Sequence, residues 1–159
     1  MEGLTMKTKA IDKLKELYLT ANKKKYPSIP DFARCTPNYS DKTANGLTKS
    51  IIDFINLTGY QAERISNTGR QLDNRKTVKD ILGNTRTIGS VKFIPGTGCN
   101  GTADISATIQ GKSVKIEVKI KDKQSPAQIE YQKKIESAGG IYFIAKDFQS
   151  FYNWYLQLI

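Results

Sequence analysis

Asp104, Glu117 and Lys119 are the residues of this chain whose types and spacing best suit hydrolytic chemistry. They lie in two short runs, 103–109 and 113–120, in which polar and apolar residues alternate. This alternation is typical of half-buried strands, whose side chains point to opposite faces in turn. All three polar residues therefore share one face. Two carboxylates and a lysine on one surface can bind a divalent metal ion and assist the attack of water on a phosphate ester.

The break between the two runs is short enough to predict a tight antiparallel hairpin. A loop at Gln110 and Gly111 would place Asp104 opposite Glu117. A loop shifted one residue onward would place Asp104 opposite Lys119, with Glu117 on the diagonal. In either register the two carboxylates lie about 4.5–8 Å apart. Like charges at that separation repel unless a cation lies between them or one acid is protonated.

A Mg²⁺ ion, with Mn²⁺ as its substitute, is the cation that this donor set favours. Asp104, Glu117 and the backbone carbonyl of Val118 would offer hard oxygen ligands, and Mg²⁺ keeps several waters and a substrate phosphate besides. Lys119 could orient or deprotonate a water, or offset charge in the transition state. The competing interpretation is an ordinary hairpin, because any solvated sheet face carries scattered acids and lysines.

The surrounding patterns predict an α/β fold. A helix with an apolar stripe ends at Gly59, a second begins at an N-cap Ser125, and a buried strand follows Gly139 and Gly140. We expect helices over 45–58, 125–138 and 148–158, and strands over 60–65, 103–109, 113–120 and 141–145. The order is helix, three-stranded antiparallel meander, helix, strand and helix, which predicts a mixed central sheet flanked by helices.

Two further regions are organised differently. Residues 1–44 read as a short amphipathic helix and a linker with three prolines, placed before a domain over 45–159. This segment could pack on the domain, pair with a second subunit or touch DNA. Residues 66–90 read as an insertion whose basic residues suit a flap on DNA, although a solvated loop or short hairpin fits equally well. Those basic residues are Arg70, Arg75, Lys76 and Arg86.

The composition of the chain excludes several classes of chemistry. The chain has 159 residues, a formal charge of +10 and no histidine. The charge suits a polyanionic partner. The lack of histidine excludes histidine-ligated metal sites and every Ser-His or Cys-His nucleophile. Cys35 and Cys99 have no CxxC spacing, so we expect neither a zinc site nor a disulfide framework, but a reduced cytoplasmic setting. No stretch reaches the length of a membrane span.

Gly96, Gly98 and Gly101 spell a GxGxxG pattern. A dinucleotide site would need a helix next, whereas an alternating strand follows, so we expect a loop that enters the site or a plain turn.

Asp104, the run Glu117-Val118-Lys119, a following helix with Gln128, and Gly139-Gly140 before an apolar strand resemble the PD-(D/E)XK nuclease superfamily. The chain is most similar to virus-type replication and repair nuclease (VRR-NUC) domains and archaeal-type Holliday junction resolvases, over residues 45–159. The resemblance implies a restriction-endonuclease-like core. Asp104 and Glu117 match its metal ligands, Lys119 its lysine, and Gln128 a glutamine near its site.

The match has two departures. Ala103 stands where the family has a proline, and Thr48 stands where resolvase-like members place a glutamate on the first helix. Asp53 lies on that helix opposite the apolar stripe and is not expected to substitute. Arg64 matches a basic residue of the resolvases and is a candidate phosphate contact, against the simpler reading of a solvated arginine. The other expected DNA contacts are Arg70, Lys121 and Lys123.

The implied function is Mg²⁺-dependent hydrolysis of DNA phosphodiester bonds by an endonuclease, selective for a Holliday junction or flap, in DNA replication, recombination or repair. A resolvase would act as a homodimer, since a junction presents paired strands. Resemblance to phage-borne members would place it in the host cytoplasm. A nuclease-fold DNA-binding protein without turnover is the alternative, and a basic structural assembly protein comes third.

Overall fold

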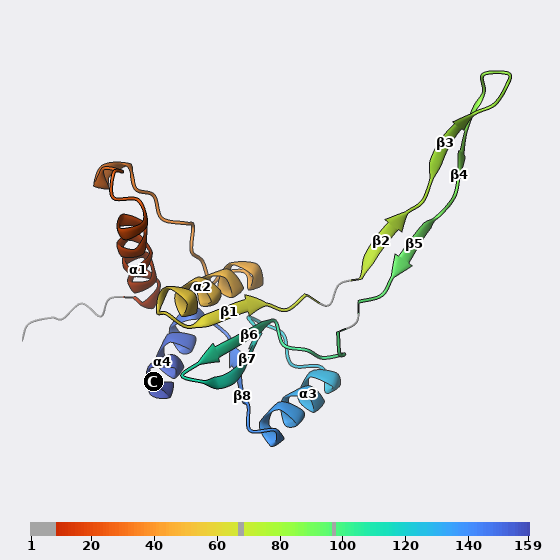
Figure 1. The fold of residues 1–159 in the computed structure, drawn as a ribbon. Coiled ribbons are helices and arrows are strands. Elements are labelled where there is room, and N and C mark those ends of the chain that lie inside the picture. Colours follow the sequence, from red (N-terminus) through yellow and green to blue (C-terminus); the bar gives the residue numbers. More distant parts are fainter. Residues whose placement is uncertain (1–8, 67–68, 97) are drawn as a thin grey trace, which may run out of the picture. The chain divides into compact units, whose positions relative to one another are not determined.

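The computed structural model describes residues 9–66, 69–96 and 98–159. The chain divides into two compact units, one formed by residues 66–99 and the other by the segments before and after them. The larger unit holds the predicted site, and its elements are shown in Figure 1. They are α1 (Ala10–Lys25), a 3₁₀ turn (Asp31–Ala33), α2 (Ala44–Leu57), β1 (Gln61–Arg64), β6 (Ile105–Ile109), β7 (Lys112–Val118), α3 (Pro126–Ser137), β8 (Ile141–Ala145) and α4 (Phe148–Leu158).

Its sheet has the order β1-β6-β7-β8. The first three strands are antiparallel neighbours, and β8 runs parallel to β7. Helix α3 makes the connection between these parallel strands, as such a crossover requires. The prediction of an α/β fold with a mixed sheet flanked by helices is confirmed.

The hairpin of β6 and β7 adopts the first of the two predicted registers. Ile105 pairs with Ile116, so the next position outward sets Asp104 opposite Glu117. The turn residues Gln110 and Gly111 have φ values of 49° and 74°. Positive φ at both central residues is the geometry of a type I′ turn, whose twist matches that of the strands. The turn therefore fixes which acid faces which.

The apolar face of the sheet holds the core. Ile105, Ile116 and Val114 are fully buried there, under the apolar stripe of α2 and the aromatic residues of α4. Phe54 of α2 lies at the centre, with its ring 5.0 Å from that of Tyr155. Edge-to-face aromatic packing of this kind adds to the stabilisation from burial. Because these helices cover the apolar face, the polar face of the sheet is open to packing by α3.

Helix α3 packs on β8 and covers the face that carries Glu117. The helix begins where the sequence predicted. Ser125 is the N-cap, and its hydroxyl accepts a hydrogen bond from the backbone amide of Gln128. Pro126 is the first residue of the first turn. The ring of Tyr131 packs edge-on against Tyr142 of β8 at 6.3 Å.

Helix α1 belongs to the same compact unit as the predicted domain. Ala10 and Leu14 are buried against α2 and α4, which confirms packing on the domain, the first of the three alternatives, for this helix. The proline-containing linker has local structure of its own. It holds a 3₁₀ turn, and the Arg34 guanidinium ties it together by hydrogen bonds to Asn22, Asp31 and the carbonyl of Tyr26.

The second unit is a hairpin that extends to Ile94, beyond the end of the insertion predicted over residues 66–90. It consists of β2 (Arg70–Asp73), β3 (Lys76–Lys79), β4 (Thr85–Ile88) and β5 (Val91–Ile94). Strand β2 pairs with β5, and β3 pairs with β4. We call residues 70–94 the long hairpin. Within the described ranges, no helix of either unit is long and apolar enough to cross a membrane.

Candidate active site around Glu117

Glu117 is the most enclosed charged residue of the polar face, with 2 % of its surface exposed. Three side chains surround its carboxylate. Lys119 Nζ lies 3.2 Å from Oε1, and the Gln128 amide donates a hydrogen bond to the same oxygen. The Tyr142 hydroxyl donates to Oε2 at 3.4 Å. The buried acid is therefore held from its own strand, from α3 and from β8.

Asp104 lies directly before β6 and is half-buried. Its Oδ2 accepts a hydrogen bond from the backbone amide of Val118 at 2.8 Å. This contact takes the place of a backbone pair and explains why the two strands are shorter than predicted at this end. It also draws the carboxylate toward the end of β7, where Glu117 and Lys119 lie.

Burial raises the pKa of Glu117, and the negative charge of Asp104 raises it further. The ammonium of Lys119 and the hydroxyl of Tyr142 oppose this shift. Burial and the charge of Glu117 likewise raise the pKa of Tyr142, so its hydroxyl remains a donor. The pair of acids thus has an excess of negative charge that a cation would relieve.

Gln128 connects this acid to the start of α3. Its side-chain oxygen accepts a hydrogen bond from the Ser125 amide, which completes a capping box, while its nitrogen donates to Glu117. Both halves of the amide are used. The sequence predicted Gln128 near the site, and the structure places it there.

A lysine-lined hollow of about 570 Å³ begins at Lys119. The predicted DNA contacts Lys121 and Lys123 line it, and both are exposed. Lys146 joins them from the end of β8, because the parallel register sets that end beside the end of β7. Asp122 is the acid in this lining. The hollow can accept an anionic group next to the carboxylates.

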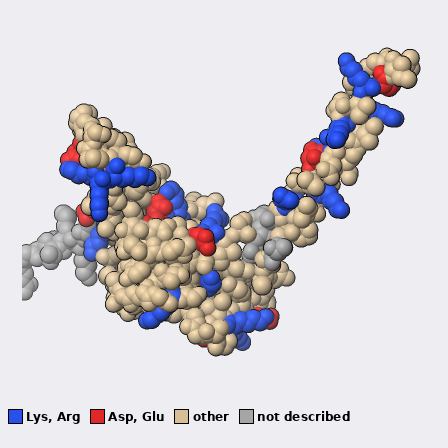
Figure 2. Space-filling view, viewed as in Figure 1, with Lys and Arg blue, Asp and Glu red and all other residues tan. Residues whose placement is uncertain are grey.

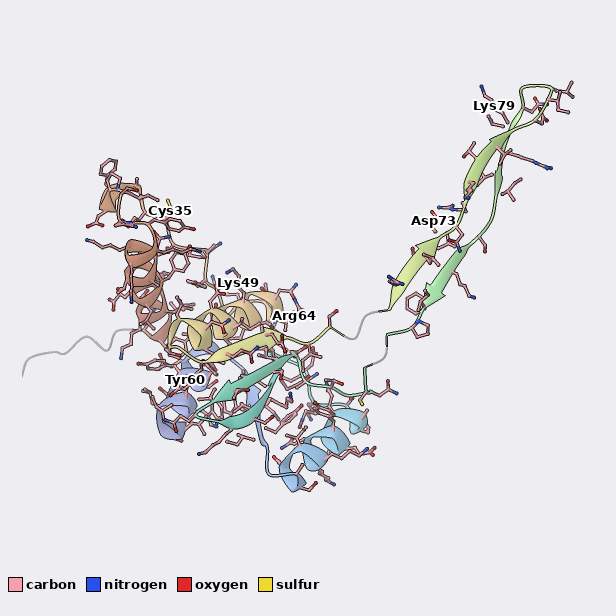
Figure 3. The ribbon with its side chains drawn as sticks, in the orientation of Figure 1. Cys35, Lys49, Tyr60, Arg64, Asp73 and Lys79 are labelled. Atoms are coloured by element: carbon pink, nitrogen blue, oxygen red, sulfur yellow. The ribbon has the colours of Figure 1, made fainter. Side chains whose placement is uncertain are left out.

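Other predicted residues lie elsewhere. Arg64 pairs with Ile105 and so occupies the opposite face of the sheet, where it donates to Asn45 of α2 at 3.0 Å (Figure 3). Thr48 is buried and bonds back to the carbonyl of Ala44. Asp53 pairs with Lys49 at 2.6 Å on the same helix. Arg70 belongs to the long hairpin.

Two site residues were missed from the sequence. Tyr142 was expected only as part of an apolar strand, and Lys146 was not singled out. Both are positioned by the parallel pairing of β7 with β8. An available signal was the polar hydroxyl within an otherwise apolar run, since a buried tyrosine needs a hydrogen-bond partner.

The metal ligands predicted from the sequence are Asp104, Glu117 and the carbonyl of Val118. In the part of the chain that the structure describes, no group of three or more histidine, cysteine, aspartate or glutamate residues is placed to hold a metal ion. Two carboxylates are fewer than a closed protein cage would use, but they match the way Mg²⁺ binds with retained waters and a substrate phosphate.

Comparison of the chain with protein-family models gives no matching family, and comparison with curated proteins gives no match either.

Proposed function

We propose that the chain is a Mg²⁺-dependent endodeoxyribonuclease with a restriction-endonuclease-like core. The observation that carries this proposal is the buried Glu117 opposite Asp104, with Nζ of Lys119 3.2 Å away, and Lys119 also lines a hollow that holds three further lysines. The order of strands and helices supports the same core. Phosphodiester hydrolysis needs negative groups for a metal ion and positive groups for a phosphate, side by side.

A purely structural role explains this arrangement poorly. Burying a carboxylate beside a second one opposes folding, and apolar residues of similar volume would serve a sheet at least as well. An acid whose pKa is raised by burial and by a like charge, in contact with a lysine that lines a hollow, marks a candidate functional site. The charge of the hollow points to an anionic substrate.

Asp104, Glu117 and the carbonyl of Val118 would hold the metal ion. When bound, Mg²⁺ supplies polarisation of the phosphate and a more acidic water. The residues of the chain then have distinct tasks. Lys119 is placed to hold or transfer a proton beside the acids, and the lysines of the hollow bind the phosphate. Gln128 and Tyr142 position Glu117.

A DNA-binding protein without turnover is the second candidate. One observation favours it: Thr48 occupies the place of the resolvase glutamate, and its hydroxyl is bonded to the helix backbone. A site that needs a third acid would then be incomplete.

The test is cleavage of labelled linear duplex, flap and four-way-junction DNA with Mg²⁺ or Mn²⁺. Asp104→Asn and Lys119→Ala should each lower the rate at least 100-fold. Lys115→Ala is the matched control, because Lys115 lies on the same face of β7 but bonds to Ser106 instead. A chain that binds DNA and cuts none of the three substrates supports the second candidate. Equal cutting by all variants overturns the site assignment. Paired cuts in the junction would add support for a two-fold dimer.

A further inference from the structure

The long hairpin keeps a single register along its whole length. Arg70 pairs with Ile94 at one end, and Lys79 pairs with Thr85 near the other. The backbone amide of Asn74 donates to the carbonyl of Ser90 between them, in the same register. Cross-strand partners therefore have the same parity, so even-numbered residues share one face and odd-numbered residues share the other.

The even face carries four cations, two on each side of the hairpin. Each cation is paired across the hairpin with an aliphatic residue that is at least partly exposed. The pairs are Arg70 with Ile94, Lys92 with Leu72, Lys76 with Ile88, and Arg86 with Val78. Among the described residues, none of these four cations forms an ion pair. Figure 2 shows Lys and Arg side chains spread along this unit.

The odd face is different. Its Arg75 is neutralised by Asp73, with 2.7 Å between Nη2 and Oδ2, which leaves Lys79 as its remaining cation among the described residues. Figure 3 labels Asp73 and Lys79 on this unit. Threonines, Val91 and Phe93 make up much of the rest. The excess positive charge is thus concentrated on the even face.

The tip is built to expose two apolar residues. Asp80 Oδ1 accepts hydrogen bonds from the amides of Leu82 and Asn84, and Gly83 takes a φ of 84°. This is a three-residue turn closed by a glycine in the left-handed region. Ile81 and Leu82 are 104 % and 87 % exposed. Two adjacent aliphatic side chains that are exposed on one turn are candidates for contact with another surface.

We propose that the long hairpin binds duplex DNA in the major groove through its even face, with Ile81 and Leu82 packed on the bases at its tip. The identity of the polyanion rests on the proposed function. A two-stranded β-ribbon fits the major groove. The two cations on each side of the hairpin can meet the phosphates of the two opposite groove walls, while the aliphatic residues of the same face meet the base edges and their methyl groups.

The length of the hairpin agrees with this partner. Arg70 to Asp80 covers ten residue steps, which at about 3.4 Å per residue gives roughly 34 Å. Because the major groove winds around the duplex axis, a ribbon of this length follows it for only part of one helical turn. The strong twist of a two-stranded ribbon allows the four cations to follow one groove over that stretch.

Two other partners for the even face agree less well with its charges and apolar residues. A membrane-surface element separates its charges and its apolar residues onto opposite faces, whereas here they share the even face. A second copy of the same hairpin would bring like charges together, since residues 66–99 contain six Lys or Arg and two Asp.

The test measures DNA binding by the full chain in EDTA with the Asp104→Asn substitution, so that binding is read without hydrolysis. The two-site variant Lys76→Gln with Arg86→Gln removes cations from the even face. Its matched control, Arg75→Gln with Lys79→Gln, removes one arginine and one lysine at similar levels of the odd face.

The even-face variant should bind a 20-bp duplex about 10-fold more weakly, because it loses two contacts with phosphates. Its slope of log affinity against log salt should fall by about 1.8. The control should change affinity less than about 3-fold.

A third variant, Ile81→Ser with Leu82→Ser, should weaken duplex binding and leave the salt slope unchanged. Equal losses in the two charge variants would overturn the proposal, as would equal affinity for a single strand of the same length. Loss of binding to anionic phosphatidylserine vesicles with duplex binding unchanged would overturn it in favour of a membrane. Failure of the unsubstituted chain to cut DNA contradicts the proposed hydrolysis alone, because these binding measurements do not depend on it.

Discussion

The side-chain amide of Gln128 donates a hydrogen bond to Glu117 Oε1 while its oxygen accepts from the Ser125 amide. The residue that closes the capping box of α3 therefore also positions the buried acid of β7. Any movement at the start of α3 is transmitted to the carboxylate through one side chain. Two roles that are usually assigned to different residues are combined here.

Substitutions at the two ends of the capping box should separate these roles. Ser125→Ala removes only the cap and should lower the free energy of unfolding by about 1 kcal/mol with little change in hydrolysis. Gln128→Ala should have a similar effect on stability and also slow hydrolysis at least 10-fold. Lys133→Gln, at an exposed position further along α3, is the control for both. Urea unfolding and initial rates on saturating DNA measure the two effects, and equal rates for Ser125→Ala and Gln128→Ala would contradict the positioning role.

The raised pKa of Glu117 predicts a pH-dependent stability in EDTA. Because the folded chain holds this proton more tightly than the unfolded chain, the contribution to stability is complete below the ordinary pKa of 4.5. It is lost as the pH rises through the raised value. Relative to the parent protein, Glu117→Gln should therefore gain stability as the pH increases from 4.5 to 8. The gain is about 1.4 kcal/mol for each unit between the folded and unfolded pKa values.

Glu130 offers a control of opposite sign. Lys134 lowers the pKa of Glu130 on the exposed face of α3, so Glu130→Gln should lose a little stability relative to the parent as the pH rises through the acid range. Thermal unfolding across this pH range measures both variants. A constant difference between Glu117→Gln and the parent protein would show that Glu117 titrates normally.

Lys146 should contribute to DNA binding although it lies outside the Glu-X-Lys motif. Lys146→Gln removes one cation from the hollow and should weaken duplex binding about 3-fold, with a salt slope lower by about 0.9. Lys112→Gln makes the same change at the far end of β7 and should have little effect. Fluorescence anisotropy over a series of salt concentrations tests this. Equal effects of the two substitutions would mean that only net charge matters.

Gly101 should be more sensitive to substitution than Gly111, although both have a positive φ. It has a φ of 77°, and an added Cβ would lie 2.3 Å from the carbonyl oxygen of Ala127 at the start of α3. Gly111 has a φ of 74° with nothing within 4 Å of its Cβ position. Gly111→Ala should cost about 1–2 kcal/mol from backbone strain alone. Gly101→Ala should cost clearly more in urea unfolding, and similar costs would show that the contact with α3 yields easily.

The faces of the site hairpin were predictable from a local rule, because alternation assigned the residues of its two strands to one face or the other. The sequence left two registers open, and the Gln110–Gly111 turn of the structure is the one that sets Asp104 opposite Glu117. Tyr142 and Lys146 escaped because their positions depend on a parallel pairing between β7 and β8, which local sequence does not determine. The face of Arg64 follows from its pairing with Ile105 of β6. That pairing is not visible in the local sequence, so alternation by itself did not show that Arg64 lies away from the acids.

The long hairpin shows a different limit of sequence reasoning. Its strands are short and mostly polar, and its side chains bury little against one another. Without a core, periodicity gives a weak signal, so a loop and a hairpin remained equally good interpretations. The position of its turn could not be predicted either, because aliphatic residues such as Ile81 and Leu82 are more typical of a core, whereas the structure exposes both.

The same absence of a core has a thermodynamic consequence. Two-stranded sheets are marginally stable in water, so the long hairpin should open locally at a much lower free energy than the four-stranded β1-β6-β7-β8 sheet. Its amide hydrogens should exchange early, and a ligand that lies along both strands should slow them. Part of the binding energy would then be used to order the hairpin, which would appear as an unfavourable entropy on top of any salt-dependent term.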